Sequence, residues 1–136
     1  ASARAQLMFE VIKPALDSGK VVICDRFIDS SFAYQGYGRR INPGHIAGVN
    51  NIALQGILPD LTILLDIPPE AALRRRYKSS GPDRIEQGDM EFYQRVCEGY
   101  KALAKLYPDR IKTVNADRNR GEVFNDIKAH IDKILY

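Results

Sequence analysis

The sequence predicts an α/β protein built on a parallel sheet, and three apolar runs carry this prediction. Residues 20–27 (KVVICDRF), 61–67 (LTILLDI) and 111–117 (IKTVNAD) are rich in β-branched residues and end at charged or polar positions. That pattern is typical of strands buried on both faces. Helical patterns alternate with the runs, which favours parallel strands joined by helices.

The segments between these runs are predicted in chain order from apolar spacing and from Gly and Pro. The chain opens with a predicted helix that ends at Gly19 and that Pro14 would bend. Its apolar face consists of Leu7, Met8, Val11, Ile12, Ala15 and Leu16. Residues 29–44 contain three glycines and three aromatics without clear periodicity, which indicates a structured loop with a short helix near 30–35. A helix over 45–55 follows and stops before Gly56.

Three further helices complete the predicted order. Pro68-Pro69 starts one that runs to about Tyr77, because proline suits a first helical turn. A long helix follows Asp89 and ends at Pro108, and a closing helix covers 121–136.

The composition excludes several protein classes. The 136 residues carry 20 Lys plus Arg against 17 Asp plus Glu, so a net charge of +3 does not by itself indicate a nucleic-acid binder. Cys24 and Cys97 fit no zinc pattern and are predicted to be free, reduced thiols. No apolar stretch approaches the roughly 18 residues of a membrane helix, and the first ten residues lack the pattern of a signal peptide, so we expect a cytoplasmic protein.

Charged residues follow the predicted strands at the edge where open parallel sheets bind ligands. Asp25 and Arg26 lie at the end of the first strand. Arg offers a planar fork that matches phosphate oxygens, and a strand-end carboxylate can hold Mg²⁺. A surface ion pair between these two neighbours is the equally weighted alternative. Tyr34 and Tyr37 would stack on a base or sugar, or simply pack the loop onto the sheet.

A second basic cluster lies at the end of the helix that Pro68-Pro69 starts. Arg74, Arg75, Arg76 and Lys78 run into SSGPDRIE, a segment suited to close over a polyphosphate. The alternative for any single one of these arginines is a solvated helix face. The pattern GxxxxGK[ST] occurs nowhere in the sequence, no nucleophilic Ser/His or Cys/His set is visible, and His45 and His130 are interpreted as surface or packing residues.

Five segments together resemble bacterial thymidylate kinase. They are ARAQ near the start, VVICDRFIDSSFAYQGYGR, LPDLTILLDIPPEAALRR, PDRIEQGDMEFYQRVCEGY and VNAD, in the family's order and spacing. The resemblance implies a P-loop kinase fold, in which a three-layer arrangement places helices on both faces of a parallel sheet. It also implies transfer of the γ-phosphoryl group of ATP to dTMP with Mg²⁺, usually by a homodimer, without nucleic acid or membrane as a partner.

The resemblance also implies roles for single residues. Arg4 corresponds to the arginine that bonds the thymine ring. The positions that line the nucleoside pocket or close over it are Ser31, Tyr34, Gln35 and Tyr100. Arg26 corresponds to the arginine that contacts the acceptor phosphate, and Asp25 to the carboxylate near the metal.

On the ATP side, the lid cations correspond to Arg75, Lys78 and Arg84, within a lid at about 74–88. Asn115, Ala116 and Asp117 correspond to the loop beside adenine. Phe27 stands where Tyr or His is commoner, a change with little expected effect on the reaction class.

The chain departs from the family at its front. The family's first strand, its P-loop and the aromatic residue that stacks on thymine have no counterpart here. We therefore expect residues 1–136 to be one partial domain, the carboxy-terminal two-thirds of a kinase, lacking the central strand of its sheet. Such a chain is expected to be inactive and poorly stable alone, because apolar strand edges would be exposed.

Three other functions stay open at this point. A kinase for another nucleoside or nucleotide would differ in its acceptor. A non-catalytic module would keep dimer-forming helices and a weak nucleoside monophosphate pocket. Nucleic-acid binding through the basic segment ranks last because the charge is nearly balanced.

Overall fold

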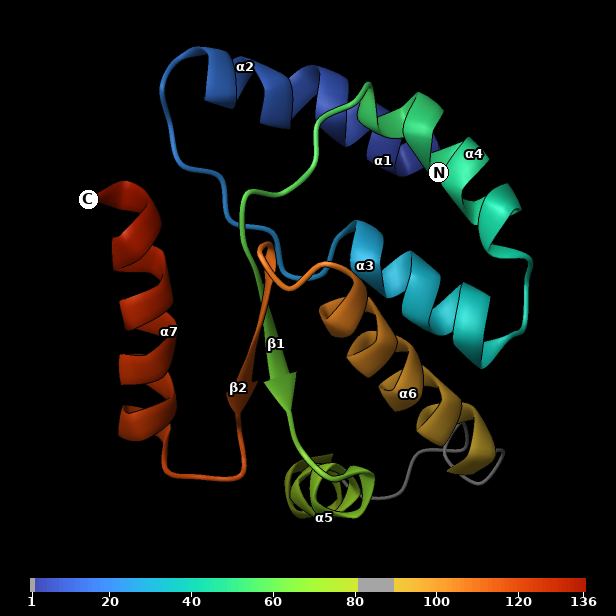
Figure 1. Cartoon of the computed structure of the whole chain (residues 1–136), viewed down its shortest axis with the longest axis vertical. Helices are drawn as coiled ribbons and strands as arrows, with labels where there is room; N and C mark the ends of the chain where they lie inside the picture. Colours follow the sequence, from blue (N-terminus) through green and yellow to red (C-terminus); the bar gives the residue numbers. More distant parts are fainter. Residues whose placement is uncertain (1, 81–89) are drawn as a thin grey trace. The chain divides into compact units, whose positions relative to one another are not determined.

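The computed structural model of the chain describes residues 2–80 and 90–136, which form two compact units, Ala1–Leu58 and Pro59–Tyr136 (Figure 1). Each unit has its own buried residues and is described by itself. The expectation of one partial domain over 1–136 stays a prediction.

The first unit opens with the predicted amphipathic helix, which has an irregular centre. It comprises α1 (Ser2–Leu7), the π-helix η1 (Met8–Ile12) and α2 (Lys13–Asp17). The widened turn of η1 ends at Ile12, two residues before Pro14, which has no N–H to donate to the carbonyl four residues back. Of the predicted apolar face only Met8 and Ile12 are buried, while Leu7, Val11 and Leu16 are exposed.

A second helical stretch replaces most of the loop predicted for 29–44. It consists of α3 (Ile28–Ser31) and the π-helix η2 (Phe32–Gly38), followed by α4 (Pro43–Leu54). Gly36, one of the glycines that suggested a loop, has a packing role instead, since a Cβ at this position would lie 3.3 Å from Ile46 Cδ1. The helix predicted over 45–55 is confirmed as α4, with Asn42 as its N-cap.

The strand predicted for residues 20–27 is wrong. This segment has no assigned strand, and Val21 and Ile23 are 66% and 88% exposed, whereas Val22 and Phe27 pack on the unit's core. A strand needs a neighbour to pair with its N–H and C=O groups, and the described residues supply none for this segment. The core itself is formed by Met8, Ile12, Ile28 and Leu54.

The second unit confirms the other two predicted strands and their parallel pairing. It contains β1 (Thr62–Asp66), α5 (Pro69–Ser80), α6 (Met90–Leu106), β2 (Ile111–Asn115) and α7 (Arg120–Leu135). β1 and β2 pair in parallel from Thr62 opposite Ile111 to Asp66 opposite Asn115. Asp66 and Asn115 therefore end neighbouring strands at the same edge of the sheet.

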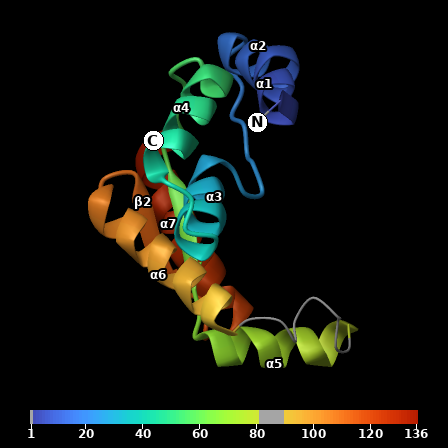
Figure 2. The same cartoon turned by 90° about the vertical axis from the view of Figure 1, so that its right-hand side faces the viewer.

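Helices lie on both sides of this two-stranded sheet. α7 lies on one side and α6 on the other (Figures 1 and 2). Successive residues of a strand point to opposite faces, and both Ile111 and Val114 of β2 are buried, so each face of β2 is covered. Val96 and Leu103 are the buried residues that α6 adds.

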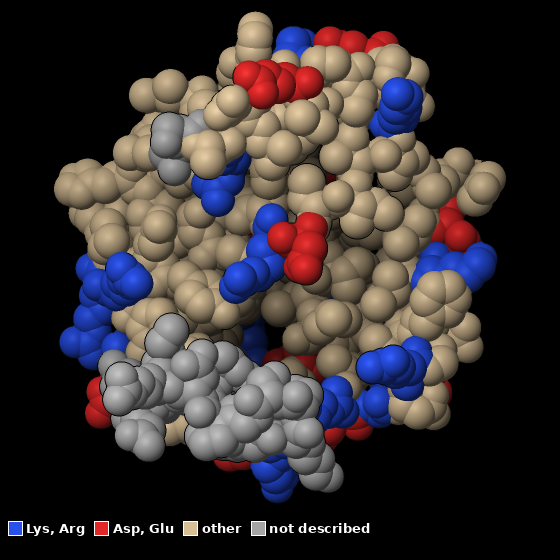
Figure 3. All heavy atoms as spheres, turned by 180° about the vertical axis from the view of Figure 1, so that it is seen from behind, with Lys and Arg blue, Asp and Glu red and all other residues tan. Residues whose placement is uncertain are grey.

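The described surface carries charges of both signs. Figure 3 shows Lys and Arg side chains interspersed with Asp and Glu on one face. Among the described helices, none combines the length and the apolar character that crossing a bilayer requires.

Candidate functional site

Arg4, on α1, lies at the centre of a polar cluster in the first unit. Its Nη2 donates a hydrogen bond of 2.9 Å to Ser31 Oγ on α3, and its Nη1 donates to Asn50 Oδ1 on α4. The guanidinium also lies over the ring of Phe27, 5.6 Å from the ring centroid. Three helices far apart in the sequence thus meet at one cation.

Asn50 is the member of this cluster that sequence reasoning missed. It is only 4% exposed, and its Nδ2 donates to Ile46 O at 2.7 Å. A signal for it existed in the pattern of α4, because a polar residue occupies a position on the same helix face as the buried residues Ile46, Ala53 and Leu54. A buried polar side chain at such a position needs partners, and here both ends of the amide have one.

A cavity of about 300 Å³ adjoins this cluster. Its lining residues come from α1, α3, η2, α4 and the connection before α4: Arg4, Ser31, Gln35, Ile41, His45, Ile46, Val49 and Asn50. Three of the predicted substrate-binding residues, Arg4, Ser31 and Gln35, are therefore brought together. His45, interpreted from the sequence as a surface or packing residue, is exposed at the rim of the same cavity.

Arg26 and Tyr34 form a second pair in the first unit. The Arg26 guanidinium lies over the Tyr34 ring, 5.5 Å from the ring centroid. Arg26 also has a φ of 63°, in the left-handed region that non-glycine residues rarely adopt. Asp25 beside it is exposed, so its carboxylate oxygens are accessible to a ligand.

In the second unit, Arg75 is brought to the loop that follows β2. Its Nη1 donates to Ala116 O at 3.0 Å, and its Nη2 lies 3.2 Å from Asp117 Oδ1 as a hydrogen-bonded ion pair. Asn115 shapes this loop, because its Oδ1 accepts the N–H of Asp117 at 2.9 Å. The predicted lid cation and the three predicted adenine-loop residues therefore form one local group.

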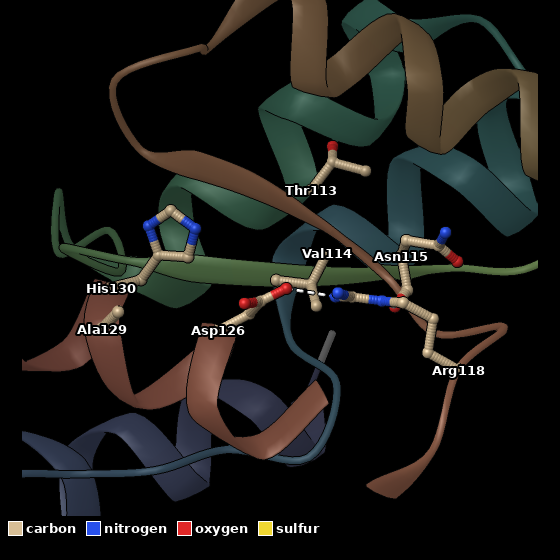
Figure 4. Close-up of a pocket in the computed structure, with 7 residues that line it drawn as sticks. All are labelled: Thr113, Val114, Asn115, Arg118, Asp126, Ala129 and His130. Atoms are coloured by element: carbon tan, nitrogen blue, oxygen red, sulfur yellow. Dashed lines mark hydrogen bonds and ion pairs between the residues drawn. The ribbon is translucent and has the colours of Figure 1, made fainter. Parts of the chain in front are cut away.

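A cavity of about 350 Å³ lies between β2 and α7 in the same unit (Figure 4). Its lining was not predicted as a set: Thr113, Val114, Asn115, Arg118, Asp126, Ala129 and His130. Arg118 and Asp126 form an ion pair beside it (Figure 4). Arg118 Nε also donates to Asn115 O at 3.3 Å. His130 is half-buried in this lining.

Cys97, on α6, lies in surroundings that favour the protonated form of its thiol. Burial raises the pKa of the Cys97 thiol, Asp66, Glu70 and Glu98 raise it further, and Lys101 opposes them. Lys101 Nζ is itself 3.7 Å from Asp66 Oδ1. Cys97 therefore stays a protonated thiol at neutral pH and is a poor nucleophile. Tyr100, predicted to close over the nucleotide, is half-buried on the same helix.

Two predicted site residues fall beyond what the structure describes. Arg84 lies in residues 81–89, and the side chain of Lys78 is likewise outside the described set. Arg4, Arg26 and their partners belong to the first unit, whereas Arg75 and Asn115–Asp117 belong to the second. Among the described residues, no group of three His, Cys, Asp or Glu side chains is arranged to hold a metal ion.

The parallel strands of the second unit, with helices on both sides, make this an α/β protein. Arg4 in the first unit and Arg75 in the second each donate hydrogen bonds to polar side chains or loop carbonyl groups of their own unit. The chain belongs to the thymidylate kinase family, whose profile matches residues 1–127. Membership implies the P-loop kinase fold, and the α/β organisation with parallel strands agrees with it.

Similar proteins come from several bacteria. The thymidylate kinase of Methylococcus capsulatus is 47% identical over 134 residues, 98% of this chain. Those of Maridesulfovibrio salexigens and Gloeobacter violaceus are 47% identical over 94% and 99% of the chain. The aligned regions make up 64%, 62% and 65% of these relatives' own lengths, so the chain spans somewhat less than two-thirds of the proteins it matches.

Proposed function

We propose that the protein containing this chain transfers the γ-phosphoryl group of ATP to dTMP, giving dTDP. The observation that carries the proposal is the Arg4 cluster. In a chain of this family, the arginine expected to bond thymine is held by Ser31 and Asn50 beside a cavity of about 300 Å³.

Arg4 retains donors for a base. A guanidinium has five N–H groups, and the bonds to Asn50 and Ser31 use one on each Nη, which leaves the Nε–H and one N–H on each Nη. These donors match the carbonyl oxygens of a pyrimidine. Gln35, on the same cavity, adds an amide that both donates and accepts, and Tyr34 would pack against the deoxyribose.

Phosphoryl transfer requires cations around the migrating group, because its charge spreads over three oxygens. Arg26 would bind the acceptor phosphate, and its position over Tyr34 would couple sugar and phosphate recognition. Arg75, Lys78 and Arg84 would supply positive charge from the ATP side. The protein would thereby act by positioning and electrostatic stabilisation, without a covalent enzyme intermediate.

The residues proposed to hold Mg²⁺ and to lie beside adenine have side chains or backbone groups suited to those ligands. Asp25 is one exposed carboxylate, and Mg²⁺ in such enzymes takes one or two carboxylates together with phosphate oxygens and water. When bound, the ion would neutralise charge on the phosphates. Asn115, Ala116 and Asp117 would lie beside adenine, and Arg75 connects Ala116 and Asp117 to α5.

The test is turnover of dTMP and ATP by the full-length protein, with dTDP and ADP measured together and with dUMP, dCMP and thymidine as competing acceptors. We expect dTDP to form at least tenfold faster than any other product at equal acceptor concentration. Preference for another acceptor would mean a different nucleoside or nucleotide kinase. Binding of dTMP without turnover would mean a non-catalytic module.

The 136-residue polypeptide alone is proposed to be inactive. It contains no GxxxxGK[ST] sequence, whose backbone and lysine hold the β- and γ-phosphates in P-loop enzymes. ATP turnover by that polypeptide would contradict this part of the proposal. A homodimer, expected from the resemblance, and a cytoplasmic location, expected from the composition and the opening residues, also remain proposals.

A further inference from the structure

Asn50 lines the cavity beside Arg4, and both ends of its amide are hydrogen-bonded within the protein. Its Oδ1 accepts from Arg4 Nη1, and its Nδ2 donates to Ile46 O one helical turn back at 2.7 Å. The second bond fixes which way the amide faces, because turning it over would place oxygen against the Ile46 carbonyl oxygen. Oδ1 is thereby aimed at the guanidinium.

Three contacts together restrain the plane of the guanidinium. Asn50 holds Nη1, Ser31 Oγ holds Nη2 at 2.9 Å, and the ring of Phe27 lies 5.6 Å from the guanidinium carbon. Two hydrogen bonds to different nitrogens of a planar group leave it little rotational freedom. A pre-oriented fork loses less entropy when it binds a planar partner.

We propose that Asn50 is a positioning residue, which acts through Arg4 to set the affinity and base selectivity for the pyrimidine nucleotide. The inference rests on the proposed function. In the described contacts, Asn50 Oδ1 is the acceptor that fixes Arg4 Nη1. Asn50 is only 4% exposed, which protects this bond from water. Without it the guanidinium would rotate about its Ser31 contact and lose its alignment with the base.

A purely structural role is the competing explanation, since a buried asparagine also stabilises its own helix. The two explanations differ for Asn50→Asp. A carboxylate keeps an acceptor for Arg4 and makes a stronger, charge-assisted bond, but it places a charge in a buried position beside a carbonyl. A positioning role therefore predicts that Asn50→Asp is milder than Asn50→Leu for substrate affinity, and a structural role predicts the reverse.

The experiment compares Asn50→Leu, Asn50→Asp and the control Asn51→Leu in the full-length protein. Asn51 is the exposed neighbour on α4, so the control introduces the same side chain one position along the helix. We expect Asn50→Leu to raise KM for dTMP about tenfold with kcat within about twofold. Asn50→Asp should stay within about threefold of wild type in KM, and Asn51→Leu should match wild type.

A double-mutant cycle with Arg4→Ala separates the two explanations further. If Asn50 acts through Arg4, adding Asn50→Leu to Arg4→Ala leaves KM for dTMP unchanged. An unchanged KM in the Asn50→Leu single variant overturns the proposal. The proposal is also overturned if Asn50→Leu raises KM for dTMP by the same factor in the Arg4→Ala variant as in wild type.

One measurement does not depend on the reaction at all. In ¹⁵N NMR spectra, the Arg4 guanidinium should show slow rotation of its Nη groups in wild type and fast rotation in Asn50→Leu. If the wild-type protein does not phosphorylate dTMP, the proposed function is wrong, but the NMR comparison still tests whether Asn50 positions Arg4. Identical Arg4 spectra in the two proteins would overturn it.

Discussion

Arg26 combines an unfavourable backbone with an exposed charged side chain. Its φ of 63° costs an L-residue roughly 1–2 kcal/mol relative to the right-handed region. Backbone strain of this kind persists where the surroundings over-determine it, and such places are often functional. Here the guanidinium lies over the Tyr34 ring, at the end of the segment that connects α2 to α3.

Replacing Arg26 by Gly should separate stability from activity. Glycine relieves the left-handed strain but adds chain entropy to the unfolded state and loses the contact with Tyr34, so the free energy of unfolding should change by less than about 1 kcal/mol. Under the proposed function Arg26 binds the acceptor phosphate, so its loss should lower kcat/KM for dTMP at least about a hundredfold. Urea unfolding and steady-state kinetics on the full-length protein measure both quantities.

Arg40 provides a matched control for this substitution. It is exposed, has a φ of 58° and has no role in the proposed site. Arg40→Gly should therefore relieve similar strain and leave kcat/KM unchanged. Equal activity of the Arg26→Gly and Arg40→Gly variants would remove Arg26 from the proposed mechanism.

At the residue scale, the sequence predicted which residues belong to the candidate site better than it predicted their hydrogen-bond partners. The cluster of Arg4, Ser31 and Gln35 was expected from motif resemblance, and the structure brings the three around one cavity. Asn50 was not expected, because its role depends on how α4 packs against α1, which apolar periodicity alone does not show. The pairing of Arg75 with Asp117, 42 residues away, depends in the same way on the path of α5 past the end of β2.

At the scale of elements, α6 has the clearest amphipathic pattern and a matched pair of leucines. Leu103 is 6% exposed, whereas Leu106, less than one turn further on, is 66% exposed. The same deletion of side-chain atoms should therefore have very different costs at the two positions.

Leu103→Ala should reduce the free energy of unfolding of the full-length protein by about 2–4 kcal/mol, because it removes buried apolar contacts and leaves a cavity. Leu106→Ala should change it by less than about 0.5 kcal/mol. Urea titration of the two variants measures the difference. Equal destabilisation would mean that Leu106 is covered in the full-length protein.

Elements were predictable where local pattern and tertiary neighbours agree. The runs at 61–67 and 111–117 form β1 and β2, because each supplies the other's hydrogen-bond partner. The equally apolar run at 20–27 has no assigned strand, since pairing partners cannot be read from one segment's composition. The prediction of a loop over 29–44 was wrong because it took the glycines as helix breakers. Gly36 instead lies within η2, where its lack of a side chain permits close packing against Ile46.

At the scale of the whole chain, both units expose large apolar side chains. In the first unit, Val21 and Ile23 are 66% and 88% exposed, and in the second Leu65 of β1 and Phe124 of α7 are 51% and 63% exposed. Single exposed apolar residues are ordinary in soluble proteins. Val21 and Ile23, however, lie in one segment that pairs with no strand among the described residues, and this combination favours association with other chains.

The polypeptide of residues 1–136 produced alone should therefore bind the dye ANS several-fold more strongly than the full-length protein and elute as more than a monomer in size-exclusion chromatography. Replacing Val21 and Ile23 together by Ser should lower the dye signal and shift elution toward the monomer, because it removes apolar surface without touching the core formed by Met8, Ile12, Ile28 and Leu54. Ile28→Ser is the contrasting control, since a polar group in that core should increase dye binding. A dye-free monomer of residues 1–136 would show that the exposed segment folds onto its own chain in solution.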